Sequence, residues 1–280
     1  MRYRELNERY PELNLLLLLG VLEVAGLLAL AVVQHFGTEA RGRLSGGGFV
    51  GMLAFQAAAC AAVMLWARKA DGWTLQRFRM ERPVLPPLVL GVLAGAFVSL
   101  GMLAYHLLVR GRGLELAVEG ASVQARLVWT VPSWLLLAPL LSLKDELLFR
   151  GYAFVKLARA RSALYGLGVS ALLFAVIHSI EQPPTLWQFG GLIATALYAT
   201  WLFHKTGSLW APVGARALVV LGDMLVSGNN QLGGLWRYDV QPEGSMGDAA
   251  VYVVLLWLSG VLVKLTTRGG EDAVPRAPGS

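Results

Sequence analysis

Eight apolar runs recur along the chain, and they leave few folds open to it. Each is near the ~20 residues that a helix needs to cross the hydrocarbon of a bilayer. The runs are continuous in Leu, Ala, Val and Gly and do not alternate with polar residues, which favours helices over a barrel. We therefore predict an all-α, polytopic membrane protein with about eight transmembrane helices. The runs lie at about residues 14–34, 47–67, 84–109, 127–157, 163–180, 186–204, 209–227 and 249–266.

The overall composition supports lipid as the solvent for much of the chain. Hydrophobic residues make up 56% of the 280 and charged residues 15%, a balance that a soluble domain rarely has. No internal repeat, low-complexity block or soluble domain is visible in the sequence. The expected organisation is a single transmembrane domain over residues 1–268, with a motif-bearing core at about 125–230 and a flexible cytoplasmic tail at 269–280. The lipid bilayer is the first expected partner.

The distribution of basic residues predicts the orientation. Basic residues concentrate in cytoplasmic loops, and 17 of the 24 Lys and Arg residues fall in the segments that are cytoplasmic if the N-terminus is inside. We predict a protein of the cell inner or plasma membrane with both termini cytoplasmic. The formal net charge of +6 reflects this bias, and no nucleic-acid partner is expected. The first run lacks a small-x-small cleavage pattern, so it is expected to be a retained anchor.

Three charged side chains interrupt the run at 127–157. They are Asp145, Glu146 and Arg150, and charge at membrane depth suggests a functional site. Glu146 and Arg150 are four residues apart, so on a helix they share a face and can pair, while Asp145 points elsewhere. His178, one helical turn after Phe174 in the next run, could meet these acids. The simpler alternatives are an ion pair at a helix end and a hydrogen-bonded core histidine.

Three motifs in order carry a resemblance to a known family. Asp145-Glu146-x-x-x-Arg150, Phe174-x-x-x-His178 and the segment Thr206-Gly-Ser-Leu-Trp-Ala-Pro212 resemble the CPBP family, the CAAX-protease and bacteriocin-processing intramembrane endopeptidases, over about residues 125–230. The resemblance implies an eight-helix membrane bundle that hydrolyses membrane-associated or exported peptides. It also implies that the first acid polarises the attacking water, the second orients the arginine, and the histidine assists the water or stabilises charge.

Three positions depart from the family pattern. Asp145 replaces a Glu, which withdraws the carboxylate by roughly 1.5 Å where an error of about 1 Å can cost on the order of a hundredfold in rate. Arg216, four residues after Pro212, replaces a His, and Val220 replaces an Asn or Asp. An arginine cannot act as a base at neutral pH, although it can stabilise an oxyanion or pair with an acid. Asp223 lies about 10 Å along the helix from Arg216 and is a poor substitute for the lost polar group.

The motif positions predict no metal site. Only one of them, His178, holds a histidine, and a zinc site usually needs three protein ligands. We expect no other cofactor.

Two functions follow from the sequence, and it leaves the choice between them open. In the first, the chain is an intramembrane endopeptidase with a modified catalytic set of Asp145, Glu146, Arg150, His178 and Arg216. In the second, it is a catalytically inactive homologue that binds, escorts or sorts a membrane substrate or a partner protease. A transporter would show repeats with broken helices in matching halves, and the sequence shows neither.

Overall fold

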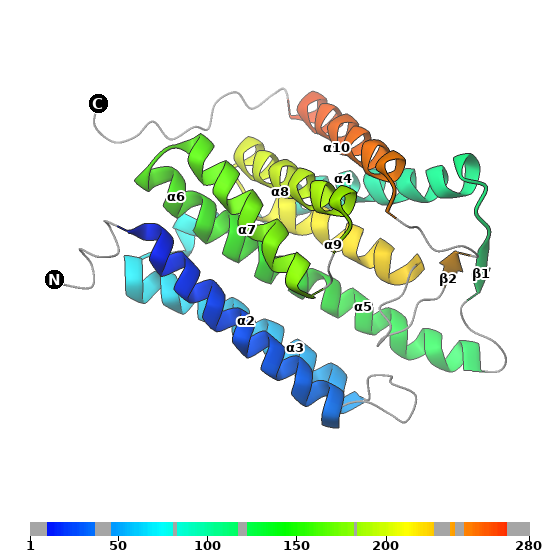
Figure 1. The fold of residues 1–280 in the computed structure, drawn as a ribbon, viewed down its shortest axis with the longest axis horizontal. Coiled ribbons are helices and arrows are strands. Elements are labelled where there is room, and N and C mark those ends of the chain that lie inside the picture. Colours follow the sequence, from blue (N-terminus) through cyan, green and yellow to red (C-terminus); the bar gives the residue numbers. More distant parts are fainter. Residues whose placement is uncertain are drawn as a thin grey trace.

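The computed structural model describes residues 10–36, 46–80, 83–116, 122–181, 184–226, 236–238 and 244–267. Within these ranges the chain forms eight helical segments, two of which contain a π-helical stretch (Figure 1). An all-α membrane bundle is thereby confirmed. The helices are α2 (Pro11–Phe36), α3 (Gly46–Asp71), α4 (Leu85–Ala104) with η2 (Tyr105–Val109), α5 (Ser122–Glu146) with η3 (Leu147–Phe154) and α6 (Val155–Ala160), α7 (Ala163–Glu181), α8 (Leu186–Thr206), α9 (Trp210–Val226) and α10 (Met246–Thr266).

Six of these segments have the length and hydropathy of membrane spans among the described residues, fewer than the eight that the apolar runs predicted. The two others are the long α5–η3–α6 segment and α9, which is 17 residues long. These two carry the acids and arginines of the predicted motifs. The six are Pro11–Val33, Gly47–Asp71, Leu85–Val109, Ala163–Ile180, Leu186–Thr206 and Met246–Thr266.

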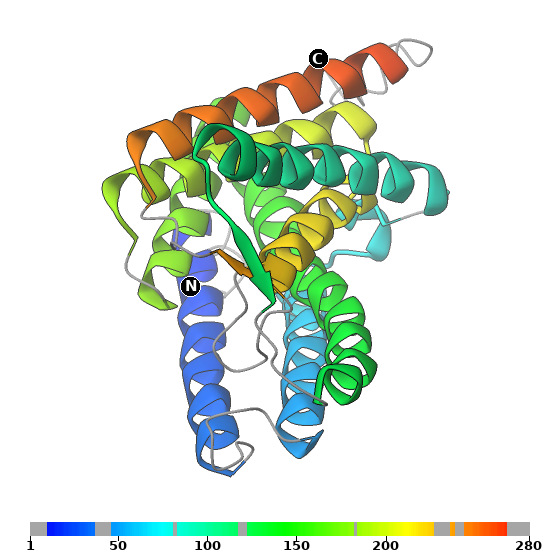
Figure 2. The same ribbon diagram turned by 90° about the vertical axis from the view of Figure 1, so that its right-hand side faces the viewer.

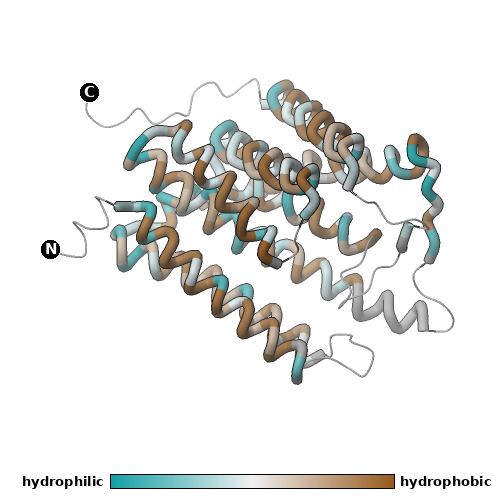
Figure 3. Tube along the Cα trace, viewed as in Figure 1, coloured by the Kyte–Doolittle hydropathy of each residue, from teal (hydrophilic) through white to brown (hydrophobic). Residues whose placement is uncertain are grey.

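The surface of the bundle is apolar where lipid would surround it. Figure 3 shows hydrophobic residues along much of α2, and Leu13, Leu17 and Leu28 of that helix each expose more than half of their side-chain surface. An apolar face of this extent is unfavourable in water and favourable in hydrocarbon. The chain is therefore an integral membrane protein. The predicted tail at 269–280 lies outside the described residues.

Helix α9 lies in the middle of the arrangement, where it packs against both α4 and α5. Helices α2 and α3 lie side by side, and α10 packs against α4 and α8 (Figures 1 and 2). Two short strands that the apolar runs did not predict, β1 (Leu114–Leu116) and β2 (Trp236–Tyr238), pair antiparallel beside the end of α9. The central place of α9 positions its polar residues against the acids of α5.

Glycines let α4 and α9 approach each other closely. A Cβ atom added at Gly91 would overlap the backbone carbonyl of Ala211, and one at Gly95 would overlap that of Ala215. Gly214 faces the carbonyl of Leu88 in the same way. Small residues at such contacts allow two helix backbones to approach closely. The resulting van der Waals contacts stabilise the association of helices in lipid.

We predict that Gly91→Ala destabilises the protein by about 1–3 kcal/mol, because the added methyl group must push two helix backbones apart. Gly20→Ala is the matched control: nothing lies within 4 Å of its added Cβ, so its greater helix propensity should be neutral or stabilising by up to about 1 kcal/mol. Unfolding of both variants in mild detergent measures the difference. Equal stability of the two would contradict the packing described for α4 and α9.

Candidate functional site

The three motifs converge in the interior of the bundle. The first two acids end α5, the arginine of the same motif lies in η3, the histidine lies near the end of α7, and the second arginine lies in the middle of α9. These residues are Asp145, Glu146, Arg150, His178 and Arg216. The structure brings Asp145, His178 and Arg216 into direct contact and places Glu146 and Arg150 beside them.

The Arg216 guanidinium contacts both the acid and the histidine, and His178 Nε2 itself lies 3.3 Å from Asp145 Oδ2. The Nε and Nη2 atoms of Arg216 donate to Asp145 Oδ2 over 3.1 and 2.7 Å. The same Nη2 atom lies 2.8 Å from His178 Nε2. Asp145 is almost fully buried, and Arg216 and His178 are mostly buried. A two-atom contact of this kind is among the stronger ion-pair geometries.

The hydrogen bonds of His178 favour one arrangement of its protons. Its Nδ1 atom lies 2.9 Å from the carbonyl oxygen of Phe174, which can only accept, so Nδ1 carries a proton. A second proton on Nε2 would face the N–H of Arg216 at 2.8 Å. Nε2 also lies 3.3 Å from Asp145 Oδ2. It accepts from Arg216 when it carries no proton and donates to Asp145 when it does, so in both states it is engaged within the site.

Lys144 completes the neutralisation of Asp145. Its Nζ atom lies 3.2 Å from Asp145 Oδ1, the oxygen that Arg216 does not contact. Lys144 is not among the site residues predicted from the motifs. Its position next to the acid pair was the available signal, but spacing alone does not show whether adjacent side chains turn toward each other.

Glu146 and Arg150 form a second, looser pair. The predicted four-residue spacing brings Arg150 Nε to 3.3 Å from Glu146 Oε2, and both side chains are fully buried. Neither carboxylate oxygen of Glu146 nor the two terminal nitrogens of Arg150 has a hydrogen-bond partner within the described structure. Such orphaned buried groups are rare and indicate room for water or a polar ligand.

Phe174 links the two pairs. The guanidinium carbons of Arg150 and Arg216 each lie 4.7 Å from the centre of its ring. The His178 ring stacks on it at 4.1 Å. Cation–π contacts strengthen away from water, so this aromatic residue holds both arginines in place. The motif identified Phe174, but the sequence gave no indication of this role.

The third motif has Val220 at the position where the family pattern has a polar Asn or Asp. Val220 packs among apolar residues of the core that surrounds Trp134 and Met224. The described hydrogen bonds of the Arg216 guanidinium run to Asp145 and His178 and not to Asp223, one turn beyond Val220.

The residues present do not fit a three-ligand metal site. Among the described residues, no three His, Cys, Asp or Glu side chains are grouped to hold an ion. At the centre of the site, Asp145 and His178 both contact the Arg216 guanidinium.

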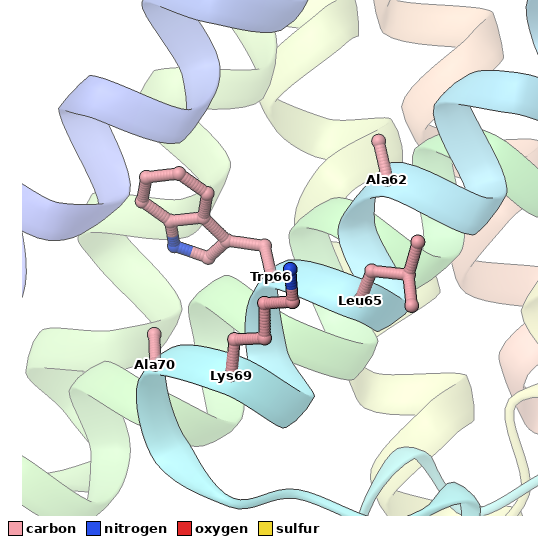
Figure 4. Close-up of a pocket in the computed structure, with 5 residues that line it drawn as sticks. All are labelled: Ala62, Leu65, Trp66, Lys69 and Ala70. Atoms are coloured by element: carbon pink, nitrogen blue, oxygen red, sulfur yellow. The ribbon is translucent and has the colours of Figure 1, made fainter.

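A lateral groove of about 640 Å³ lies between helices that include α5 and α9, which carry Asp145 and Arg216. Its walls come from α3, α4, α5 and α9, and they are almost entirely apolar. Leu143 of the wall is two residues before Asp145, and Val213 is three residues before Arg216. Val50 and Leu136 are more than half exposed, so the groove opens toward lipid. A second hollow of about 360 Å³ lies near the end of α3, between Ala62 and Ala70 (Figure 4). None of the five site residues that the motifs predicted lines either hollow.

Comparison with known families agrees with the motifs. Residues 127–222 match the family model of type II CAAX prenyl endopeptidase Rce1-like proteins. All of the motif positions, from Asp145 to Val220, lie inside this segment. The match confirms the resemblance to the CPBP family, and the chain carries an Rce1-like segment of this intramembrane-protease family. Neither the comparison with curated proteins nor that with solved structures found a match.

We predict that Asp145 and Arg216 are strongly coupled in stability. A double-mutant cycle with Asp145→Asn and Arg216→Gln should give a coupling energy of about 0.5–3 kcal/mol, because each single change leaves a buried charge with poorer compensation. The control pair is Glu12 and Arg161, which meet at 3.4 Å on the exposed surface and should couple by about 0.2–1 kcal/mol. Unfolding in detergent measures both cycles, and a coupling at Asp145–Arg216 no larger than in the control would contradict the geometry.

Proposed function

We propose that this chain, with its Rce1-like segment, is a catalytically silent member of the family that binds membrane-associated or exported peptides. The observation that carries the proposal is the Arg216 guanidinium, which bonds to both Asp145 and His178. In the family these two positions activate water. Here both face a positive charge that cannot accept a proton.

The chemistry of peptide hydrolysis supports this reading. A general base needs a free lone pair directed at the attacking water. Arg216 donates two hydrogen bonds to Asp145 Oδ2 and lies 2.8 Å from His178 Nε2, and Lys144 contacts Asp145 Oδ1. A water molecule that approaches either base must first displace a guanidinium.

The energetic cost of that displacement is large. Removing one partner from a buried ion pair costs about 3–5 kcal/mol. Since about 1.4 kcal/mol corresponds to a tenfold change in rate, a mechanism that requires Arg216 to leave would be slowed by roughly 10²–10⁴. Val220 adds no polar group to stabilise the oxyanion.

The lateral groove supports retained binding. It joins the lipid-facing surface to within one helical turn of Asp145 and Arg216, so an apolar anchor or an apolar peptide segment can lie there while polar peptide groups meet the arginine. The proposal includes a single transmembrane domain over residues 1–268, in the inner or plasma membrane with both termini cytoplasmic. A second membrane protease is a suitable recipient for the bound peptide.

One observation favours the alternative of an active endopeptidase. Both carboxylate oxygens of Glu146 lack a hydrogen bond although the side chain is fully buried. A substrate carbonyl that attracts Arg216 would draw the guanidinium toward the developing oxyanion. Asp145 and His178 would then be released to act with Glu146 on a water molecule.

We predict that the purified protein does not cleave a library of single-span peptides, prepared with and without a lipid anchor, but that restoring the motif increases cleavage. The variant Asp145→Glu/Arg216→His/Val220→Asn should cleave at least roughly a hundredfold faster than wild type, because it removes the blocking pair. Mass spectrometry of the peptides measures cleavage. Cleavage by the wild type that disappears in Glu146→Ala and His178→Ala would overturn the proposal and establish the active endopeptidase.

We predict that filling the lateral groove weakens peptide binding. Ala57→Trp places an indole in the groove and should raise the Kd for the same peptides by on the order of tenfold, about 1.4 kcal/mol. Ala58→Trp is the matched control, because the adjacent residue is exposed and is not part of the groove wall. Fluorescence titration measures both, and equal effects of the two variants would exclude the groove as the binding surface.

A further inference from the structure

A cluster of three arginines lies at the end of the bundle where α3, α6 and α8 finish. Arg77 belongs to the short 3-10 helix η1 (Leu75–Phe78), Arg79 directly follows it, and Arg159 lies in the last turn of α6. Two neighbouring basic residues have acidic partners: Lys156 lies 3.1 Å from Asp71, and Arg161 lies 3.4 Å from Glu12. In the part of the chain that the structure describes, no carboxylate pairs with any of the three arginines.

The three positive charges act on one another. Burial lowers the pKa of Arg79, and the charge of Arg159 lowers it further. Burial likewise lowers the pKa of Arg159, with the charge of Arg77 as the second cause. Arg79 is half-buried, whereas Arg77 and Arg159 are exposed. Repulsion among neighbouring cations is relieved when an anion joins them. The cluster therefore has the electrostatic character of an anion site without its anion.

The backbone holds Arg79 in an uncommon conformation. Its φ of 54° lies in the left-handed region, which few residues other than glycine adopt. The Leu209 N–H donates to the Arg79 carbonyl over 3.0 Å, and the Trp210 indole donates to the Met80 carbonyl over 3.3 Å. The guanidinium lies 5.1 Å above the ring of Phe203. Arg79 is the left-handed residue that ends η1, and these contacts fix where its guanidinium lies.

The surroundings are those of a membrane–water boundary. Leu75 of η1 and Leu164 at the start of α7 are largely exposed, although both are apolar. Just before η1, the end of α3 carries the hollow shown in Figure 4, with apolar walls that include Trp66 and with Lys69 at its side. Apolar surface for acyl chains therefore lies near cations at headgroup level.

We propose that Arg77, Arg79 and Arg159 bind the phosphate group of an anionic phospholipid. The phosphate oxygens accept from the guanidinium groups, whose planar donors suit phosphate, and the negative charge relieves the repulsion among the three arginines. The site is separate from the Asp145–Arg216 centre, and it does not depend on whether the protein cleaves or binds peptides.

Occupation of this site also supports the start of α9. The hydrogen bonds from Leu209 and Trp210 tie the η1 turn to the first residues of the helix that carries Arg216. A lipid that fixes Arg79 thereby fixes the N-terminal end of α9. Bound lipid should raise the stability of the fold as any ligand of the native state does.

The test measures thermal unfolding of the full chain in neutral detergent with added phosphatidylglycerol, phosphatidylcholine or inorganic phosphate. Phosphatidylglycerol should raise the Tm by roughly 5 °C at saturation, with a smaller effect at high salt.

Arg77→Gln and Arg159→Gln should each remove at least half of that increase. Both side chains are exposed, so these changes should leave folding intact. Arg161→Gln, which affects an arginine that is paired with Glu12, is the control and should retain the full increase.

Each other outcome overturns the proposal. An equal increase with phosphatidylcholine would show that acyl chains and not the phosphate charge are recognised, and an equal increase with inorganic phosphate would assign the site to a free anion. If Arg161→Gln loses the increase as the cluster variants do, the effect is general surface attraction. Native mass spectrometry of bound phosphatidylglycerol on Arg79→Gln gives an independent readout, and unchanged lipid occupancy would contradict the role of that residue.

Discussion

Charges inside a bundle that crosses lipid must be neutralised by partners within the bundle, because hydrocarbon cannot solvate them. Asp145 meets this requirement with Arg216 on one oxygen and Lys144 on the other. The family pattern has a histidine at the position of Arg216, which would leave the acid free to hold water. On the function proposed above, a permanent cation in place of a neutral partner makes the carboxylate structural and no longer reactive.

The contact depends on backbone packing elsewhere. Gly91, Gly95 and Gly214 allow α4 and α9 to approach so closely that no Cβ atom fits between them. Because α9 also packs against α5, this approach determines how far Arg216 reaches toward Asp145. The position of the polar centre therefore depends on three glycines that have no side chain to take part in chemistry. A change that alters the packing of α9 should affect both the stability of the fold and the geometry of the site.

Local pattern predicted much of the fold, whereas contacts between distant residues were mostly beyond it. The run at 163–180 corresponds to α7 (Ala163–Glu181), and the pairing of Glu146 with Arg150 followed from their spacing. The resemblance to the family was confirmed over residues 127–222. Three features were not predicted: the contact of Lys144 with Asp145, the position of Phe174 between the two arginines, and the pairing of β1 with β2. The first depends on the rotamer of an adjacent side chain, and the other two depend on residues far along the chain. The catalytic roles of the site residues stay predictions.

The π-helical stretch η3, all but the last of whose residues are buried, has a consequence for how the family can vary. A π-helix closes its hydrogen bonds over five residues and not four, which usually accommodates one extra residue within an α-helix. The extra residue is absorbed within the widened turns, so the residues beyond them keep the faces that an uninterrupted helix would give them. Arg150 lies inside this stretch and Arg159 of α6 follows it. A change of length by one residue within 147–154 can therefore be taken up locally, without turning α6 relative to α5.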